Sequence, residues 1–391
     1  MDDVVIVGGA RTPIGTFGGS LKDVRCRDLG TIAVKSALRR TGTEPGDVDH
    51  VIFGHVIQDT YEASNIARDI TLAAGIPDTV PAFTLNRLCG SGLEAINMAA
   101  QFIMTGNADV VVAGGAESMS RAPYLLKNSR FGCRMGNDTV YDSMLATLTD
   151  STYHIHMGET AENLAEKLSI TREEQDQFAL ESQQKALRAI AGGKFKGEIE
   201  PVPVRSRKEE LLFAVDEHPR ETTLTALATL PTVFRKGGSV TPGNASGLND
   251  AAAAVVLMSA RRAEALGLKP LARIVSFAAS GVDPKIMGYG PVPATKKALS
   301  RAGINLSDIE LIEANEAFAA QYLAVEKELG INRQIVNPNG GAIALGHPLG
   351  ATGAILTIKL MNELQRQQKK LGLITLCVGG GQGVSSIIES I

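Results

Sequence analysis

The chain has 391 residues, of which 44% are hydrophobic and 21% charged, and its formal net charge is −3. This length allows two or three domains with a large buried core, and the composition is typical of a globular protein. The balanced charge does not indicate nucleic-acid binding, and the sequence lacks the run of eighteen apolar residues that predicts a membrane span.

Cysteine usage and the first residues suggest a location. The four cysteines form no C-x-x-C pair, so a disulfide framework is not expected and a reducing compartment is favoured. The sequence reads directly into an apolar strand pattern without a basic stretch before it, which does not resemble a secretory signal. We therefore expect a cytoplasmic protein. His154 and His156 have no third ligand in sight, so no metal site is expected.

The first 117 residues read as a unit of alternating strands and helices. Short apolar runs predict strands, and longer apolar or amphipathic runs predict helices. The second helix is apolar on nearly every face, which indicates a buried helix. The strands are expected at 4–7, 48–53 and 110–113, and the helices at 29–40 and 90–105.

A stretch of different character follows, from about 118 to 248. It begins with scattered basic residues, continues with a charged amphipathic helix over 171–191, and contains an irregular basic section at 205–208. It reads as an insertion after a strand end, where loops of α/β sheets line binding sites.

The last part of the chain repeats the first. Lys35, Leu38 and Gly42 recur as Lys296, Leu299 and Gly303 at a constant offset of 261, and the register continues to Gly92 and Gly353. Strands are expected at 272–277, 309–313 and 373–378, and helices at 295–301 and 350–365. We predict a duplicated α/β fold with two mixed, mostly parallel sheets and buried helices between them, divided into 1–117, 118–248 and 249–391.

Four segments at strand ends or helix starts carry candidate chemistry: 86–92, 315–318, 346–350 and 377–383. Cys89 precedes a helix, whose N–H groups and dipole favour a thiolate. If the halves pack about a pseudo-twofold axis, His347 faces Cys89 and can activate it. Alone, His347 could cap a helix, Cys377 could be an inert buried thiol, and Asn315 could be a turn residue.

Together these segments resemble the thiolases, the acyl-CoA C-acyltransferases. The likeness covers essentially the whole chain. It includes Arg-Thr-Pro at 11–13, Ala-Gly-Gly-Ala-Glu-Ser-Met-Ser at 113–120, Met-Gly-Glu-Thr-Ala-Glu-Asn at 157–163, Gly-Asn-Ala-Ser-Gly-Leu-Asn-Asp at 243–250 and Asn-Pro-Asn-Gly-Gly at 337–341.

The resemblance implies a role for each catalytic segment. Cys89 attacks an acyl thioester, and His347 takes its proton and helps to hold the thioester oxygen with a water positioned by Asn315. Cys377 moves the proton on the α-carbon of the second acyl-CoA. The N–H groups of Cys89 and Gly379 form a second oxyanion hole.

The resemblance also implies how the substrate binds and how the chain assembles. Coenzyme A, a substrate rather than a prosthetic group, is held by the inserted domain, with Arg220 near the adenine and Ser246 on the pantetheine. His156, Met157 and Phe318 line its tunnel. The 119–134 region resembles the loop through which short-chain thiolases form homotetramers, as dimers of dimers.

The implied activity is a reversible condensation of acetyl-CoA with acetyl-CoA or a slightly longer acyl-CoA. The segments 86–89, 154–157 and 337–339 look closest to bacterial β-ketothiolases of broad range, which are associated with polyhydroxyalkanoate monomers. Ala251 and Thr352 depart from the common pattern, and neither is expected to touch the chemistry. Two alternatives stay open: a decarboxylating ketoacyl synthase-like enzyme and a non-catalytic acyl-CoA carrier.

Overall fold

The computed structural model describes residues 3–61, 63–205 and 210–391, so 206–208 of the predicted basic section lie outside the described residues. Within these ranges, no helix is both long enough and apolar enough to cross a bilayer.

The central feature is a mixed sheet of ten strands in the order β12-β13-β14-β11-β1-β10-β5-β3-β4, with β2 paired to β10. The order β3-β5-β10-β1 is mirrored by β12-β13-β14-β11, as the duplication predicts. The strands are β1 (Val4–Arg11), β2 (Gly15–Thr16), β3 (His50–Gly54), β4 (Ala82–Leu85), β5 (Val110–Ser118), β10 (Asn249–Ser259), β11 (Ala272–Gly281), β12 (Leu311–Ala314), β13 (Leu371–Val378) and β14 (Gln382–Ser390).

Two expectations about the sheets need correction. The predicted pair of sheets is joined, because β1 and β11 share a short antiparallel ladder at Val5–Arg273 and Ile6–Ala272. Pairing is also less parallel than expected: β10 lies antiparallel between β1 and β5, and β14 lies antiparallel between β11 and β13. Strand β10 falls in the segment predicted to start the C-terminal half, yet it pairs with N-terminal strands.

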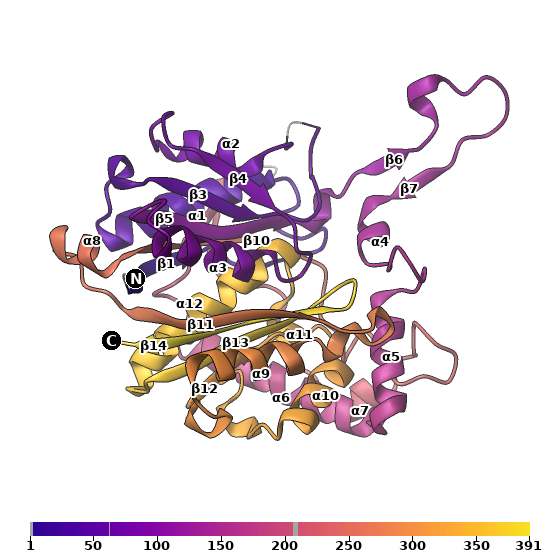
Figure 1. Ribbon diagram of the computed structural model, residues 1–391. Coiled ribbons are helices and arrows are strands. Elements are labelled where there is room, and N and C mark those ends of the chain that lie inside the picture. The colour runs from indigo at the N-terminus through magenta and orange to yellow at the C-terminus, as the bar shows by residue number, and fades with distance from the viewer. Residues whose placement is uncertain (1–2, 62, 206–209) are drawn as a thin grey trace.

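Two helices lie between the two sets of strands (Figure 1). They are α3 (Ser91–Met104) and α12 (Leu349–Gln367), and their apolar side chains pack with both sets of strands in one core. This confirms the buried helices expected from their all-round apolar character. The outer faces are covered by α1 (Cys26–Thr41) and α2 (Ile66–Ala74) on one side and by α9 (Pro291–Ala302) and α10 (Ala319–Leu329) on the other.

The inserted segment contributes a projecting hairpin and a group of helices (Figure 1). The hairpin pairs β6 with β7, and a second hairpin pairs β8 with β9. The elements are β6 (Tyr124–Leu126), β7 (Val140–Asp142), α4 (Ser143–Thr147), α5 (Met157–Leu168), α6 (Arg172–Ala191), β8 (Val202–Arg205), β9 (Glu210–Phe213) and α7 (Leu224–Ala228).

Short elements complete the described chain. They are α8 (Ala260–Ala265), α11 (Ala342–Leu345) and the 3₁₀ helices Pro45–Asp47, Met119–Arg121, Ser129–Phe131, Pro284–Tyr289, Leu306–Asp308 and Arg333–Ile335.

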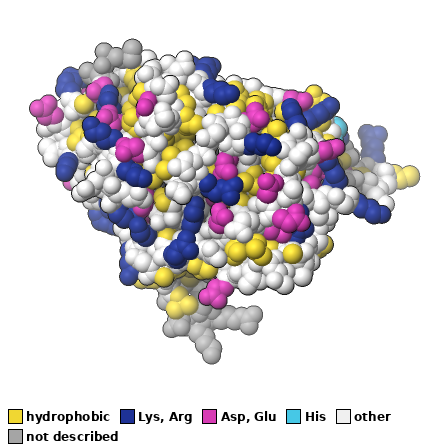
Figure 2. All heavy atoms as spheres, turned by 90° about the horizontal axis from the view of Figure 1, so that it is seen from below, with side chains coloured by type: hydrophobic (Ala, Val, Ile, Leu, Met, Phe, Trp, Pro, Cys, Tyr) yellow, Lys and Arg dark blue, Asp and Glu magenta, His cyan; other side chains and the backbone are white. Residues whose placement is uncertain are grey.

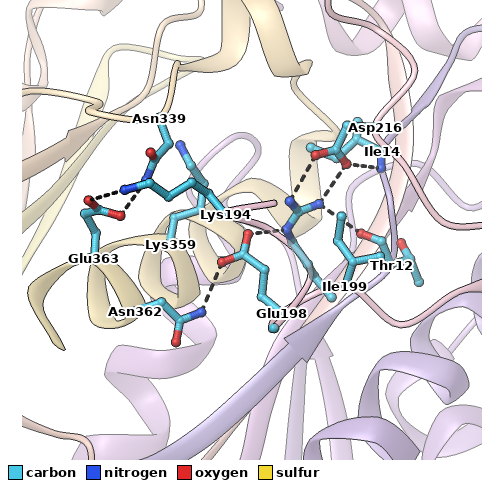
Figure 3. Close-up of polar contacts among 12 residues, drawn as sticks. Thr12, Ile14, Lys194, Glu198, Ile199, Asp216, Asn339, Lys359, Asn362 and Glu363 are labelled. Atoms are coloured by element: carbon cyan, nitrogen blue, oxygen red, sulfur yellow. Dashed lines mark hydrogen bonds and ion pairs between the residues drawn. The ribbon is translucent and has the colours of Figure 1, made fainter. Parts of the chain in front are cut away.

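A buried ion-pair network fastens the insertion to β1 (Figure 3). The Arg11 guanidinium contacts Glu198 at 2.8 Å and Asp216 at 2.8 and 3.0 Å, and all three side chains are buried. On the face seen from below, Lys and Arg side chains are interspersed with Asp and Glu (Figure 2). Charge on this face is therefore mixed, in agreement with the small net charge.

Candidate active site

Cys89 lies on a tight turn between β4 and α3. Leu88 before it has φ +44°, in the left-handed region that a leucine rarely adopts. Side-chain contacts hold this turn: Asn86 Oδ1 accepts the Leu88 N–H at 2.9 Å, and Ser91 Oγ accepts the Arg87 N–H at 2.8 Å. A strained backbone held by several contacts is common at functional sites.

The environment of the Cys89 sulfur differs from the expectation of a thiolate. Burial of the sulfur raises the pKa of Cys89 to about 11, although hydrogen bonds from the N–H groups of Gly379 and Cys89 itself favour the thiolate. Helix α3 begins two residues later, at Ser91. Desolvation therefore outweighs the N–H groups, and Cys89 rests as a thiol at neutral pH.

Gly379 lies close to the Cys89 turn. A Cβ at this position would lie 2.8 Å from Leu88 Cδ1. The residue follows β13 directly, at the start of the Gly379-Gly380-Gly381 turn that leads into β14. The same approach brings the Gly379 N–H to the Cys89 sulfur, where the sequence predicted a donor for an oxyanion.

His347 lies between α11 and α12, and every polar atom of its ring has a partner. Its backbone N–H donates to Asn249 Oδ1 at 2.9 Å, Nδ1 lies 2.7 Å from Thr352 Oγ1, and Nε2 lies 3.3 Å from Asn315 Nδ2. The side chain is buried, and this burial lowers the pKa of His347 to about 4. The imidazole is therefore neutral at pH 7 and able to accept a proton.

Asn315 and Cys377 come from neighbouring strands of the C-terminal half. Asn315 follows β12 directly, and its buried Oδ1 has no hydrogen-bond partner in the described structure, which leaves an acceptor for a water or a substrate group. Cys377 is fully buried near the end of β13. Burial first, and the neighbouring Cys89 second, raise the pKa of Cys377 well above its usual value.

A cavity of about 300 Å³ opens onto this group, and both Cys89 and His347 line it. His156 stacks on Phe234 with ring centroids 4.8 Å apart, and Phe234 meets Phe318 edge-on at 6.0 Å. The walls are mostly apolar, as expected for a slot that holds a slender chain. The other predicted binding residues Ser246 and Met157 also line the cavity.

Arg220, predicted to lie near an adenine, does not line this cavity. It lies at a separate surface hollow of about 470 Å³ with Leu187 and Thr223, where its backbone N–H donates to Gln183 Oε1 at 3.0 Å. Arg220 is thus brought to the surface of the inserted segment rather than to the reacting groups.

A group of potential metal ligands occurs elsewhere, in the described N-terminal half. Ligand atoms of Cys26, His55 and Asp59 lie within 4.8 Å of one another. However, Arg121 pairs with Asp59 at 3.3 Å, and His55 Nδ1 lies 3.0 Å from the Ala116 carbonyl, which it can only meet as a donor. Nδ1, the ring nitrogen that lies 3.7 Å from the Cys26 sulfur, therefore carries a hydrogen and cannot bind a cation, and the Asp59 carboxylate is already paired with a guanidinium.

Sequence reasoning missed three residues that shape the site: Asn249, Thr352 and Phe234. Thr352 was expected not to touch the chemistry, yet its hydroxyl lies 2.7 Å from Nδ1 of the His347 ring. A signal was available: Thr352 lies in the first turn of α12, and helical side chains point back toward the N-terminus, where His347 lies.

The arrangement can perform acyl transfer. A thiol that lines an apolar slot can attack a thioester, a neutral imidazole can take the thiol proton, and N–H groups at the sulfur can stabilise an oxyanion. A second buried thiol next to the first can move a proton at the adjacent carbon.

Known proteins match this chain along its whole length. Models of the thiolase N-terminal and C-terminal domains match residues 4–261 and 268–390. The beta-ketothiolase BktB of Cupriavidus necator is 54% identical over 391 residues, covering 100% of this chain and 99% of that protein. An acetyl-CoA acetyltransferase of Syntrophomonas wolfei is 51% identical over 394 residues, with 100% and 99% covered.

Solved structures agree. The acetyl-CoA acetyltransferase of Bacillus anthracis superposes with a TM-score of 0.98 at 52% identity, covering 100% of this chain and 99% of that one. Human mitochondrial 3-ketoacyl-CoA thiolase in complex with CoA superposes with a TM-score of 0.97 at 47% identity, covering 100% and 98%.

Proposed function

Because this chain belongs to the thiolase family, we propose that it is an acyl-CoA C-acetyltransferase that cleaves short 3-ketoacyl-CoA thioesters with coenzyme A and runs the reverse Claisen condensation. One observation carries the proposal: Cys89 and His347 line the same cavity, where the Gly379 N–H donates a hydrogen bond to the Cys89 sulfur. Coenzyme A enters as a substrate, and the chemistry needs no prosthetic group.

In the first half of the reaction, the Cys89 sulfur forms a bond to the thioester or ketone carbonyl carbon while its proton passes to His347 Nε2. The raised pKa of Cys89 and the lowered pKa of His347 support a transfer during the attack rather than a preformed ion pair. The resulting oxyanion would be held by the N–H groups of Gly379 and Cys89.

In the second half, Cys377 would move the proton at the α-carbon. During thiolysis, its thiol would protonate the acetyl-CoA enolate that leaves when the carbon–carbon bond breaks, and the resulting thiolate would take the proton of the coenzyme A thiol that then attacks acyl-Cys89. During condensation, its thiol would protonate the coenzyme A sulfur that leaves when Cys89 is acylated, and the resulting thiolate would remove the α-proton of the second acetyl-CoA. His347 and a water held by Asn315 would stabilise the enolate oxygen, a role supported by the unpartnered Asn315 Oδ1 and the 3.3 Å contact between the two side chains.

The coenzyme would reach Cys89 along the 300 Å³ cavity, with Ser246 on the pantetheine arm and His156, Met157 and Phe318 around it. Arg220 would receive the adenine end at its surface hollow.

The test is thiolysis of 3-ketoacyl-CoA substrates of four, five, six and eight carbons, followed by the absorbance of the 3-keto thioester. Cleavage confined to four carbons indicates an acetoacetyl-CoA thiolase, and comparable cleavage at five or six carbons indicates a broader range. Failure to cleave any of these substrates overturns the proposal. Turnover of malonyl thioesters alone would then indicate a decarboxylating enzyme, and CoA binding without turnover would indicate a carrier.

A pair of cysteine variants tests the assignment of the nucleophile. We expect Cys89→Ser to lower kcat by about 10³-fold or more, because a hydroxyl next to a neutral imidazole is a far weaker nucleophile here. Cys133→Ser is the matched control, since Cys133 is exposed on the hairpin away from the cavity. Near wild-type turnover by Cys89→Ser would exclude Cys89 as the nucleophile.

A homotetramer and a cytoplasmic location complete the proposal. The hairpin presents exposed apolar side chains that a partner could cover, among them Tyr124 at 67%, Phe131 at 90% and Met135 at 95% exposure. It also borders a hollow of about 830 Å³, with Leu125 and Pro123 in its lining. The cytoplasmic location rests on the free state of all four cysteines.

A further inference from the structure

We propose that Thr352 is a positioning residue for the reaction: its hydroxyl fixes the orientation and the tautomer of the His347 ring, so that Nε2 meets the Cys89 cavity without a proton. This inference rests on the proposed function, in which His347 is the base. It adds a residue that acts through His347 and does not itself touch the substrate.

The contacts at Thr352 are short and local. Thr352 Oγ1 lies 2.7 Å from His347 Nδ1 and 2.9 Å from the Pro348 carbonyl oxygen. Both residues are buried. Because Pro348 begins the turn into α12, the hydroxyl joins the ring to the first turn of a helix that is buried along almost its whole length.

The hydrogen-bond directions agree along this chain of groups. A hydroxyl has one hydrogen, and when Thr352 donates it to the Pro348 carbonyl, its oxygen is left as an acceptor. Nδ1 must then carry the ring hydrogen, and Nε2 is left with a lone pair. At the other side of the ring, Asn315 presents its Nδ2 donor to Nε2 at 3.3 Å, which requires the same tautomer.

A hydroxyl in this position differs from the carboxylate of a Ser-His-Asp triad. A carboxylate stabilises the imidazolium, whereas a hydroxyl orients the ring without adding charge. The partners of the ring, Thr352 and Asn315, are both neutral. The ring therefore rests neutral and correctly turned. When the Cys89 sulfur bonds to the acyl carbon, its proton goes to Nε2, while the Nδ1 hydrogen stays donated to Thr352.

The experiment separates loss of the hydroxyl from loss of packing. We expect Thr352→Val and Thr352→Ala each to lower kcat for acetoacetyl-CoA thiolysis about 10- to 100-fold, with KM within about twofold of wild type. Thr352→Ser, which keeps the hydroxyl, should stay within about threefold. The alanine variant keeps the test open if valine, whose methyl would crowd Nδ1, prevents folding.

The matched control is Thr357→Val on the same helix. Thr357 is also buried, and its hydroxyl also donates to the carbonyl four residues earlier, Gly353, at 2.8 Å, but it has no contact with His347 in the described structure. Its variant should turn over like the wild type. Equal losses at Thr352 and Thr357, a loss confined to KM, or a serine variant as slow as valine would each overturn the proposal.

A second readout does not depend on thiolase turnover. The rate at which iodoacetamide alkylates Cys89 at pH 7, followed by mass spectrometry of the Cys89 peptide, should fall in Thr352→Val by about the same factor as kcat. If no 3-ketoacyl-CoA is cleaved but alkylation slows as expected, the proposed function fails and the role of Thr352 stands. If alkylation is unchanged while turnover is normal, the role of Thr352 fails alone.

Discussion

At the scale of single residues, the site combines two groups that are both kept uncharged. Burial raises the pKa of the Cys89 thiol to about 11 and lowers the pKa of the His347 imidazole to about 4. A helix that begins just after a cysteine favours the thiolate, but burial away from water favours the neutral thiol. Here burial in the apolar slot outweighs the N–H groups at the sulfur, and the thiol is protonated at neutral pH.

The lowered pKa of His347 predicts how stability depends on pH. The unfolded chain, with a histidine pKa near 6.5, binds a proton that the folded chain refuses until about pH 4, so acid favours unfolding. The contribution of His347 is fully present above pH 6.5 and is lost as the pH falls toward 4. We expect it to account for about 2 kcal/mol of the loss in unfolding free energy between pH 7 and pH 5.

Urea unfolding at one protein concentration measures this contribution. His347→Asn cannot take up the proton, so its unfolding free energy should fall by less than that of the wild type between pH 7 and pH 5. His154→Asn is the control, because the His154 side chain is exposed and its replacement should leave the wild-type dependence. An equal acid loss in wild type and His347→Asn would contradict the assignment.

At the scale of elements, the two buried helices cross at glycines that the duplication relates. A Cβ on Gly353 of α12 would lie 2.1 Å from the Leu93 backbone nitrogen of α3, and one on Gly92 would lie 2.7 Å from the Gly350 carbonyl oxygen. The backbones therefore touch at the crossing. Because Cys89 precedes α3 and His347 precedes α12, this crossing sets the distance between the proposed nucleophile and the proposed base.

Gly353→Ala should therefore affect both stability and catalysis. The atom in the way is backbone, which cannot swing aside, so the helices must separate at a cost of about 1–3 kcal/mol in unfolding free energy. The same separation should lower kcat. Gly46→Ala is the control, since a Cβ there has no atom within 4 Å. A Gly353→Ala protein with wild-type urea midpoint and kcat would show that the crossing can relax.

Elements with their own periodic pattern could be predicted from the sequence, and elements defined by their neighbours could not. Two runs that are apolar on all sides predicted helices at 90–105 and 350–365. The bounds of α3 and α12 differ from these by one or two residues. Strand β10 begins Asn-Asp-Ala-Ala-Ala-Ala, a composition that favours helix, and only its position between β1 and β5 makes it a strand.

The site divides in the same way. Cys89, His347, Asn315 and Cys377 could be named as candidates because each lies in a glycine-rich or strand-end motif, and the structure brings Cys89 and His347 to one cavity. Asn249, which holds the His347 backbone at 2.9 Å, comes from 98 residues earlier in the chain. Such a contact depends on how the halves pack, which no local pattern records.

At the scale of the whole molecule, one buried cation fastens the insertion to the sheet. Arg11 of β1 bonds Glu198 and Asp216, and its guanidinium lies over the Phe195 ring at 5.1 Å from the centroid. Arg11→Met would leave two buried carboxylates without their cation. We expect a loss of about 3–5 kcal/mol in unfolding free energy.

The comparison with a surface pair makes this prediction specific. Arg39 also pairs with a glutamate of the insertion, Glu200 at 2.6 Å, but its side chain is 61% exposed. Arg39→Met should change the unfolding free energy by no more than about 1 kcal/mol. Similar losses for the two variants in urea unfolding would mean that burial does not strengthen the Arg11 contacts.

The projecting hairpin gives the last prediction, which concerns assembly. Leu126 of β6 is 55% exposed beside Tyr124 and Leu125, an apolar surface that water disfavours and a partner chain would cover. In a tetramer built through this hairpin, Leu126→Glu would place a charge in an apolar contact, where its desolvation is costly. We therefore expect the mass measured by light scattering to fall from that of a tetramer, about four times 41.2 kDa, to that of a dimer, about twice 41.2 kDa.

Leu212→Glu on β9 is the matched control, because Leu212 is 70% exposed on a different hairpin and its charge would stay in water. Since Cys89 and His347 lie in a cavity within one chain, the Leu126→Glu dimer should retain turnover, and loss of turnover together with dissociation would mean that the hairpin supports the cavity as well as the assembly.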